Sequence, residues 1–116
     1  MIRVCYPFIG DSIGGSHRST LLLIKMLDRR AYDPVLVVHE KGILTDHLER
    51  NGIKYILFPL PVFAGSSPKL FHIFMSILRI TYGLRQFIKE NEISIVHGND
   101  LRINLSWPLA SKLAGI

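Results

Sequence analysis

Apolar, strand-like segments alternate with helix-like segments along the whole chain of 116 residues. The strand-like runs are rich in β-branched and aromatic residues, which is typical of strands buried on both faces. The stretches between them carry apolar residues at helical spacing, as Leu44 and Leu48 do. We expect strands at 2–9, 35–38, 53–61 and 93–100, and helices at 16–30, 42–52, 69–90 and 106–115.

This alternation predicts an α/β fold, a three-layer, Rossmann-like parallel sheet with helices on both faces. Right-handed crossovers between parallel strands leave few topologies, and we expect the strand order 3-2-1-4. In that order the first and fourth strands are neighbours, and ligands bind beyond the carboxyl ends of the strands at such a switch point. The loops at 10–16 and 97–101 would therefore meet at the ligand site.

Length and composition limit the classes of protein to consider. A chain of this size forms one domain, 1–116, and its hydrophobic content of 48% excludes a disordered chain. The single cysteine, Cys5, lies in an apolar run, which favours a core position and a reducing compartment. Neither a signal peptide nor an apolar run of about 20 residues is evident, so we expect a cytoplasmic location.

The net charge of +5 would suit an anionic partner, but the basic residues are scattered, with Arg29-Arg30 as the only adjacent pair. The interleaved basic and aromatic residues of a nucleic-acid reader are missing, so we expect no nucleic-acid partner. No histidine pair has metal-ligand spacing with acidic or cysteine support, and we expect no metal and no cofactor.

The stretch "FIGDSIGGSHRST" interrupts the first strand with glycines in the pattern G-x-x-x-G-G. This is neither the dinucleotide fingerprint G-x-G-x-x-G nor a P-loop. The glycines either supply a turn with positive φ or let backbone N–H groups approach an anion at the start of the next helix. The candidate ligand-binding residues are Gly14, Gly15, Ser16 as helix N-cap, and His17.

A second polar group, His97, Asn99 and Asp100, follows the fourth strand. A histidine at this place could act as a general base or bind a sugar hydroxyl. The alternative is a histidine satisfied by local backbone, with Asn99 and Asp100 forming a turn. Their place at the switch point favours ligand binding. His39 ends the second strand in a plausible ligand-facing position, but it has no evident partner.

The expected helix at 69–90 is apolar over most of its circumference. Such a helix is usually buried against a sheet, and we favour that interpretation. Peripheral contact with an anionic membrane surface, through Lys69, Arg79, Arg85 and Lys89, is the alternative. Burial against a part of the protein that this chain lacks is a third.

Taken in order, four stretches resemble the amino-terminal part of a family 4 glycosyltransferase of the GT-B architecture. They are "IGGSHRSTLLLIKML", "GILTDHLERNGIKYILFPLP", "ISIVHGND" and "PLASKLAGI". The resemblance implies a retaining enzyme that moves a sugar from a nucleotide-sugar donor to a glycan, lipid or small-molecule acceptor, as in polysaccharide biosynthesis. It also implies a cleft between two Rossmann-like domains, in which Gly14, Gly15 and Ser16 would approach the donor phosphates and the acceptor.

Two departures from the family pattern bear on function. Many members read Val-His-x-His after the fourth strand, whereas this chain has His97 followed by Asn99, which cannot act as a base. The carboxyl-terminal, nucleotide-binding domain is also absent from this chain. We therefore leave the catalytic residues unassigned and expect no transferase activity from the chain alone. The fourth strand would form an exposed sheet edge, so we expect self-association.

A different class of protein is the main alternative: a stand-alone Rossmann-like module that binds a nucleotide or phosphorylated ligand without catalysis. A second domain with paired glutamates downstream of residue 116 would favour the transferase, and a natural stop codon there would favour the module. A dehydrogenase is disfavoured because G-x-G-x-x-G is missing and Glu40 is the only acidic candidate after the second strand.

Overall fold

The computed structural model describes residues 1–59, 70–100 and 102–116, with backbone alone for 70–74 and 105. Its sheet has four parallel strands in the order β3-β2-β1-β4, which confirms the expected strand order. The strands are β1 (Ile2–Phe8), β2 (Tyr32–Val38), β3 (Ile56–Leu57) and β4 (Ile95–Val96). Cys5 at the centre of β1 is paired with Val35 of β2 on one side and Val96 of β4 on the other.

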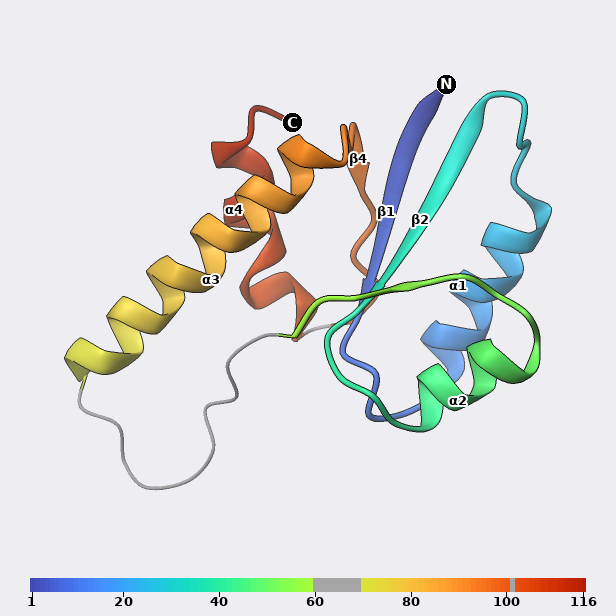
Figure 1. The fold of residues 1–116 in the computed structure, drawn as a ribbon, viewed down its shortest axis with the longest axis horizontal. Coiled ribbons are helices and arrows are strands. Elements are labelled where there is room, and N and C mark those ends of the chain that lie inside the picture. The colour runs from blue at the N-terminus through green and yellow to red at the C-terminus, as the bar shows by residue number, and fades with distance from the viewer. Residues whose placement is uncertain (60–69, 101) are drawn as a thin grey trace.

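Helices cover both faces of this sheet, as Figure 1 shows. The helices are α1 (Gly15–Met26), α2 (Ile43–Arg50), α3 (Leu70–Glu90), the 3₁₀ helix η1 (Ile103–Leu105) and α4 (Trp107–Leu113). One core cluster joins the sheet to α1 and α2, and a second joins it to α3 and α4. The three-layer α/β architecture is therefore the one that the alternating pattern predicts.

Strand β1 is buried on both faces and divides its side chains between the two cores. Tyr6 and Phe8 pack on the side of α1 and α2, whereas Cys5 packs on the side of α3 and α4. This division follows from the two-residue period of a strand. Burial raises the pKa of the Cys5 thiol to about 12, which agrees with the expected inert core position.

Two of the expected strands are shorter than their apolar runs. The run at 53–61 pairs with the sheet only at Ile56–Leu57, and the run at 93–100 pairs only at Ile95–Val96. Both strands lie at sheet edges among the described residues, where each has one neighbour and the ladder ends early. Residues 60–69, which include the expected loop and Lys69, lie outside the described residues.

The ends of α1 also differ from expectation. Gly14, not Ser16, occupies the N-cap position, so Ser16 lies inside the first turn. The helix ends at Met26, before Arg29, although the Arg29 guanidinium still donates to the Ile24 carbonyl oxygen at 3.1 Å. That contact places a cation at the helix C-terminus, as the macrodipole favours.

The second half of helix α3 packs into the core. Ile80, Leu84 and Ile88 belong to the core, whereas Ile77 and Leu78 are exposed. In Figure 1 the first turns of α3 extend away from the sheet. Sheet packing therefore explains the C-terminal half of this helix. Among the described residues, no helix combines the length and the hydropathy needed to cross a membrane.

Candidate functional site

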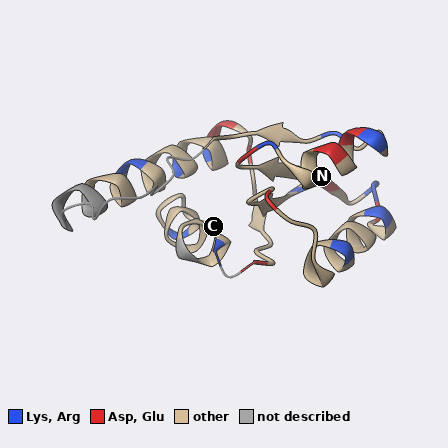
Figure 2. Ribbon diagram, turned by 90° about the horizontal axis from the view of Figure 1, so that it is seen from below, with Lys and Arg blue, Asp and Glu red and all other residues tan. Residues whose placement is uncertain are grey.

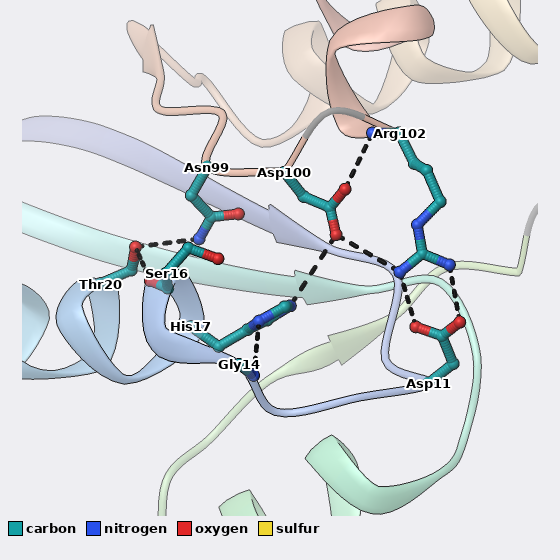
Figure 3. A network of polar contacts seen from close by, with 8 residues as sticks. All are labelled: Asp11, Gly14, Ser16, His17, Thr20, Asn99, Asp100 and Arg102. Atoms are coloured by element: carbon teal, nitrogen blue, oxygen red, sulfur yellow. Dashed lines mark hydrogen bonds and ion pairs between the residues drawn. The ribbon is translucent and has the colours of Figure 1, made fainter.

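The candidate site lies where the loops after β1 and β4 meet, at the carboxyl ends of two neighbouring strands (Figure 3). The His97 N–H donates to the Cys5 carbonyl oxygen at 2.9 Å and holds the start of the second loop against β1. Farther on, the Asn99 side-chain amide donates to Thr20 Oγ1 of α1 at 3.0 Å. The topology thus brings His17, Asn99 and Asp100 together, as the sequence predicts.

His17 is the most buried of the predicted site residues, with a side chain only 6% exposed. Its Nδ1 accepts the Gly14 N–H at 3.1 Å, so the ring hydrogen lies on Nε2. Nε2 is buried, has no hydrogen-bond partner among the described residues, and lies 3.9 Å from Asp100 Oδ2. Buried polar atoms are rarely left without a partner, so this N–H can donate to a further group at the site.

The orientation of the Asn99 amide follows from the hydroxyl that it contacts. Thr20 Oγ1 donates its hydrogen to the Ser16 carbonyl oxygen at 2.8 Å, so it can only accept from Asn99. The Asn99 Oδ1 is then left buried and without a partner among the described residues. Asn99 therefore offers an acceptor at the site and no base.

An ion pair that joins the two loops was not predicted from the sequence. Arg102 Nη1 and Nη2 bind the two carboxylate oxygens of Asp11 at 2.6 and 2.8 Å. The same guanidinium lies 3.4 Å from Asp100 Oδ2, and the Arg102 N–H donates to Asp100 Oδ1 at 2.8 Å. The hydrogen bond from Arg102 lowers the pKa of Asp11. Asp11 and Arg102 are 91 positions apart, so only the topology reveals the pair.

The glycines of the first loop have different roles. Gly10 has φ +108°, and a Cβ there would overlap the Glu40 carbonyl oxygen, so the close approach of two loops requires glycine. Gly14 and Gly15 do not have positive φ. A Cβ on Gly15 would meet nothing within 4 Å. The turn interpretation therefore applies to Gly10 and does not explain Gly15.

The remaining histidine candidates lie outside this polar network. The ring of His97 packs on Tyr6, with centroids 5.3 Å apart. His39 is a buried structural residue, whose Nδ1 donates to the Phe58 carbonyl oxygen and whose Nε2 accepts from Trp107 Nε1, both at 2.8 Å. The ligand-facing interpretation of His39 is therefore wrong. Within the described residues, no group of three or more His, Cys, Asp or Glu side chains could hold a metal ion.

Comparison with known proteins relates this fold to two solved structures. No family model matches the chain, and no curated protein matches it. The crystal structure of Acinetobacter baumannii MurG aligns with 100% of this chain and 33% of its own, at a TM-score of 0.74 and 21% identity. The crystal structure of Anabaena Alr3699/HepE in complex with UDP and glucose aligns with 98% of this chain and with 28% of the HepE chain. Its TM-score is 0.63 and its sequence identity is 15%.

These likenesses concern the fold. The chain spans about a third of the length of each neighbour, and both identities are low. The parallel sheet with order 3-2-1-4 and helices around it matches the α/β fold of these GT-B neighbours.

Proposed function

We propose that this chain is the amino-terminal, acceptor-side part of a family 4 GT-B glycosyltransferase. The enzyme would transfer a sugar from a nucleotide-sugar donor to a glycan, lipid or small-molecule acceptor with retention of configuration, in polysaccharide biosynthesis. Support comes from the fold shared with two GT-B glycosyltransferases. Further support comes from two of the four motifs that the resemblance rests on, at 13–27 and 93–100, whose loops meet where β1 and β4 are neighbours.

The observation that carries the proposal is the unexplained glycine at the start of α1. Gly15 has open space where a Cβ would lie, and no positive φ requires it. The first intrahelical bond runs from the Arg18 N–H to the Gly14 carbonyl oxygen, so the N–H groups of Gly15 and Ser16 precede the helical ladder. Such groups, at the positive end of a helix, suit the charge that develops on a leaving diphosphate.

Site residues would divide between binding and support. Gly15 and Ser16 would contact donor phosphate, while the unpartnered His17 Nε2 and Asn99 Oδ1 would be completed by ligand groups. The Gly14 N–H is engaged by His17, so Gly14 would act by positioning that ring. Asp100 would orient His17 from the other loop, and His97 would line the acceptor side. Most nucleotide contacts would come from a second domain, so this chain alone would be inactive.

Backbone NMR of the ¹⁵N-labelled chain, titrated with UDP to millimolar concentration, tests the ligand site. We expect amide shifts at Gly15, Ser16 and Asn99, and roughly tenfold weaker binding in Gly15→Ala, because a methyl group would fill the approach to the N–H groups. Gly83→Ala is the matched control, since its Cβ would make ordinary contact with Phe58 in a helix away from the site. Equal UDP binding by both variants and the wild type would refute the proposed phosphate contact.

A stand-alone binding module would share this phosphate site and differ in lacking catalysis. Assay of the full-length protein against a panel of nucleotide sugars separates the two. Transfer to an acceptor supports the glycosyltransferase, and binding without turnover of any donor supports the module.

We also propose a peripheral position at the cytoplasmic face of a membrane, through α3, and self-association through the edge of the sheet at β4. The exposed apolar side chains of α3, together with exposed Arg79 and Lys89, support the first. The place of β4 at the end of the strand order supports the second.

A further inference from the structure

The Asp11–Arg102 ion pair joins the two loops of the candidate site, and Figure 3 shows Asp100 between Arg102 and His17 of α1. Both carboxylate oxygens of Asp11 accept hydrogen bonds from the Arg102 guanidinium. The side chains are 41% and 47% exposed, so solvent screens the pair and its net contribution to stability is small. This ion pair lies between two loops of a ligand site and stabilises the fold little. A bound anion can therefore replace one of its two partners.

Asp100 is a second partner of Arg102, beside Asp11. Its Oδ2 lies 3.4 Å from Arg102 Nη2 and 3.9 Å from His17 Nε2, so one carboxylate oxygen separates the guanidinium from the first turn of α1. The Arg102 N–H is fixed to the same carboxylate. The Arg102 guanidinium and the first turn of α1 therefore share Asp100 as a neighbour.

From these contacts we infer that Arg102 is an anion-binding residue of the site and that Asp11 holds it in the absence of ligand. This inference rests on the proposed function. It adds Arg102 as a residue that binds the ligand and Asp11 as a group that competes with the ligand for Arg102. A carboxylate and a phosphoryl group present similar pairs of oxygens to a guanidinium, so a diphosphate can replace Asp11 on Arg102. The incomplete contacts of His17 Nε2 point independently to a ligand at this place.

Charge-removing variants on the two sides of the pair have opposite expected effects on anion binding. By NMR titration with inorganic pyrophosphate and with UDP, the Asp11→Asn variant binds the anion about two- to fivefold more tightly. The gain is small because Asp11, which competes with the anion for Arg102, forms only a weak surface ion pair. Arg102→Gln binds about tenfold more weakly, because charge-assisted hydrogen bonds to the anion are lost. The melting temperature of each variant checks that folding is retained.

The double variant Asp11→Asn, Arg102→Gln distinguishes two ways in which Asp11 could weaken anion binding. Asp11 could compete with the anion for Arg102, or its charge could repel the anion. If Asp11 acts by holding Arg102, then Asp11→Asn gives no gain in the Arg102→Gln background. An equal gain in both backgrounds means that Asp11 only repels the anion, and it overturns the inference. Asp33→Asn is the matched control for net charge, because Asp33 pairs with Arg3 at the amino-terminal ends of the strands, and its affinity stays at the wild-type value.

The outcomes also distinguish this inference from the proposed function. Failure of the wild-type chain to bind either probe refutes the phosphate contact of Gly15 and the role of Arg102, while the full-length assay with nucleotide sugars tests the proposed transfer separately. If the wild type binds and Gly15→Ala weakens binding while Arg102→Gln does not, the glycine site stands and the role of Arg102 is refuted.

Discussion

At the scale of single residues, His39 shows how a buried polar side chain joins parts of the chain that are far apart. It lies just after β2 and bonds the Phe58 carbonyl oxygen on one side and the Trp107 indole on the other. Both bonds require the neutral ring, with its hydrogen on Nδ1. Burial lowers the pKa of His39 below its ordinary value of 6.5, and the bond to Phe58 opposes this only in part.

The lowered pKa of His39 makes stability depend on pH in one direction. Below about pH 6.5 the unfolded chain binds a proton at this ring that the folded chain refuses, so the free energy of unfolding falls as pH falls. One proton corresponds to at most about 1.4 kcal/mol per pH unit. The loss stops once the pH is below the folded pKa. Urea unfolding from pH 7.5 to 5, followed by Trp107 fluorescence, measures it.

His39→Gln is the control for this pH dependence, because Gln keeps one donor and one acceptor but does not titrate. We expect a flatter profile for the variant than for the wild type below pH 6.5, with the other histidines contributing equally to both. Superimposable profiles would show that His39 does not carry the effect.

The sequence predicts part of the site and misses the rest for a physical reason. His17, Asn99 and Asp100 could be placed because strand order alone brings their loops together. The partners of His39 and of Arg102 depend on side-chain contacts between residues 68 and 91 positions apart, which no local pattern encodes. The run D-S-I-G-G does place an acidic residue on the ligand loop, and that was the one available signal for Asp11.

At the scale of whole elements, periodicity and the crossover rule were sufficient for the four α-helices and the strand order, but not for the 3₁₀ helix η1 or for strand length. An apolar run such as 93–100 indicates burial and β-propensity. The length of a strand also depends on how far a neighbouring strand pairs with it. Among the described residues β4 has β1 as its one neighbour, and its pairing ends after Val96. The glycine at the start of α1 caps the helix without a side chain, which explains why Ser16 was preferred from the sequence.

Helix α3 is the element for which we predict binding to anionic vesicles. Met75, Leu78 and Tyr82 are exposed along its outer side. Figure 2 shows basic residues along α3, and the sequence from 70 to 89 has no acidic residue. An exposed apolar stripe with basic flanks is suited to lie on an anionic lipid surface.

Sedimentation with vesicles of mixed phosphatidylglycerol and phosphatidylcholine measures this contact. Leu78→Gln with Tyr82→Gln lowers the partition coefficient by roughly tenfold, because two apolar side chains no longer leave water. Leu22→Gln, at an exposed leucine of α1, leaves it unchanged. Equal loss in both variants, or equal binding to pure phosphatidylcholine, contradicts a contact through α3.

At the scale of the whole molecule, the sheet is closed on neither side by the described residues, and β4 offers the better surface for a second copy. A cavity of about 380 Å³ runs beside it, lined by residues that include Ile95, Trp107 and Ser111. Ile95 is 45% exposed, and Ser111 Oγ is buried without a partner among the described residues. An edge strand beside such a hollow favours pairing with another chain.

Light scattering over a range of protein concentrations tests this pairing. The apparent mass should rise from the monomer value of 13.2 kDa toward that of a dimer. A lysine on an edge strand opposes pairing, so Ile95→Lys should remain at the monomer mass at every concentration. Leu22→Lys adds the same charge on α1 and should associate like the wild type. A wild type that stays at the monomer mass refutes self-association. If both variants lose association, net charge or another surface controls assembly and β4 is not shown to be the interface.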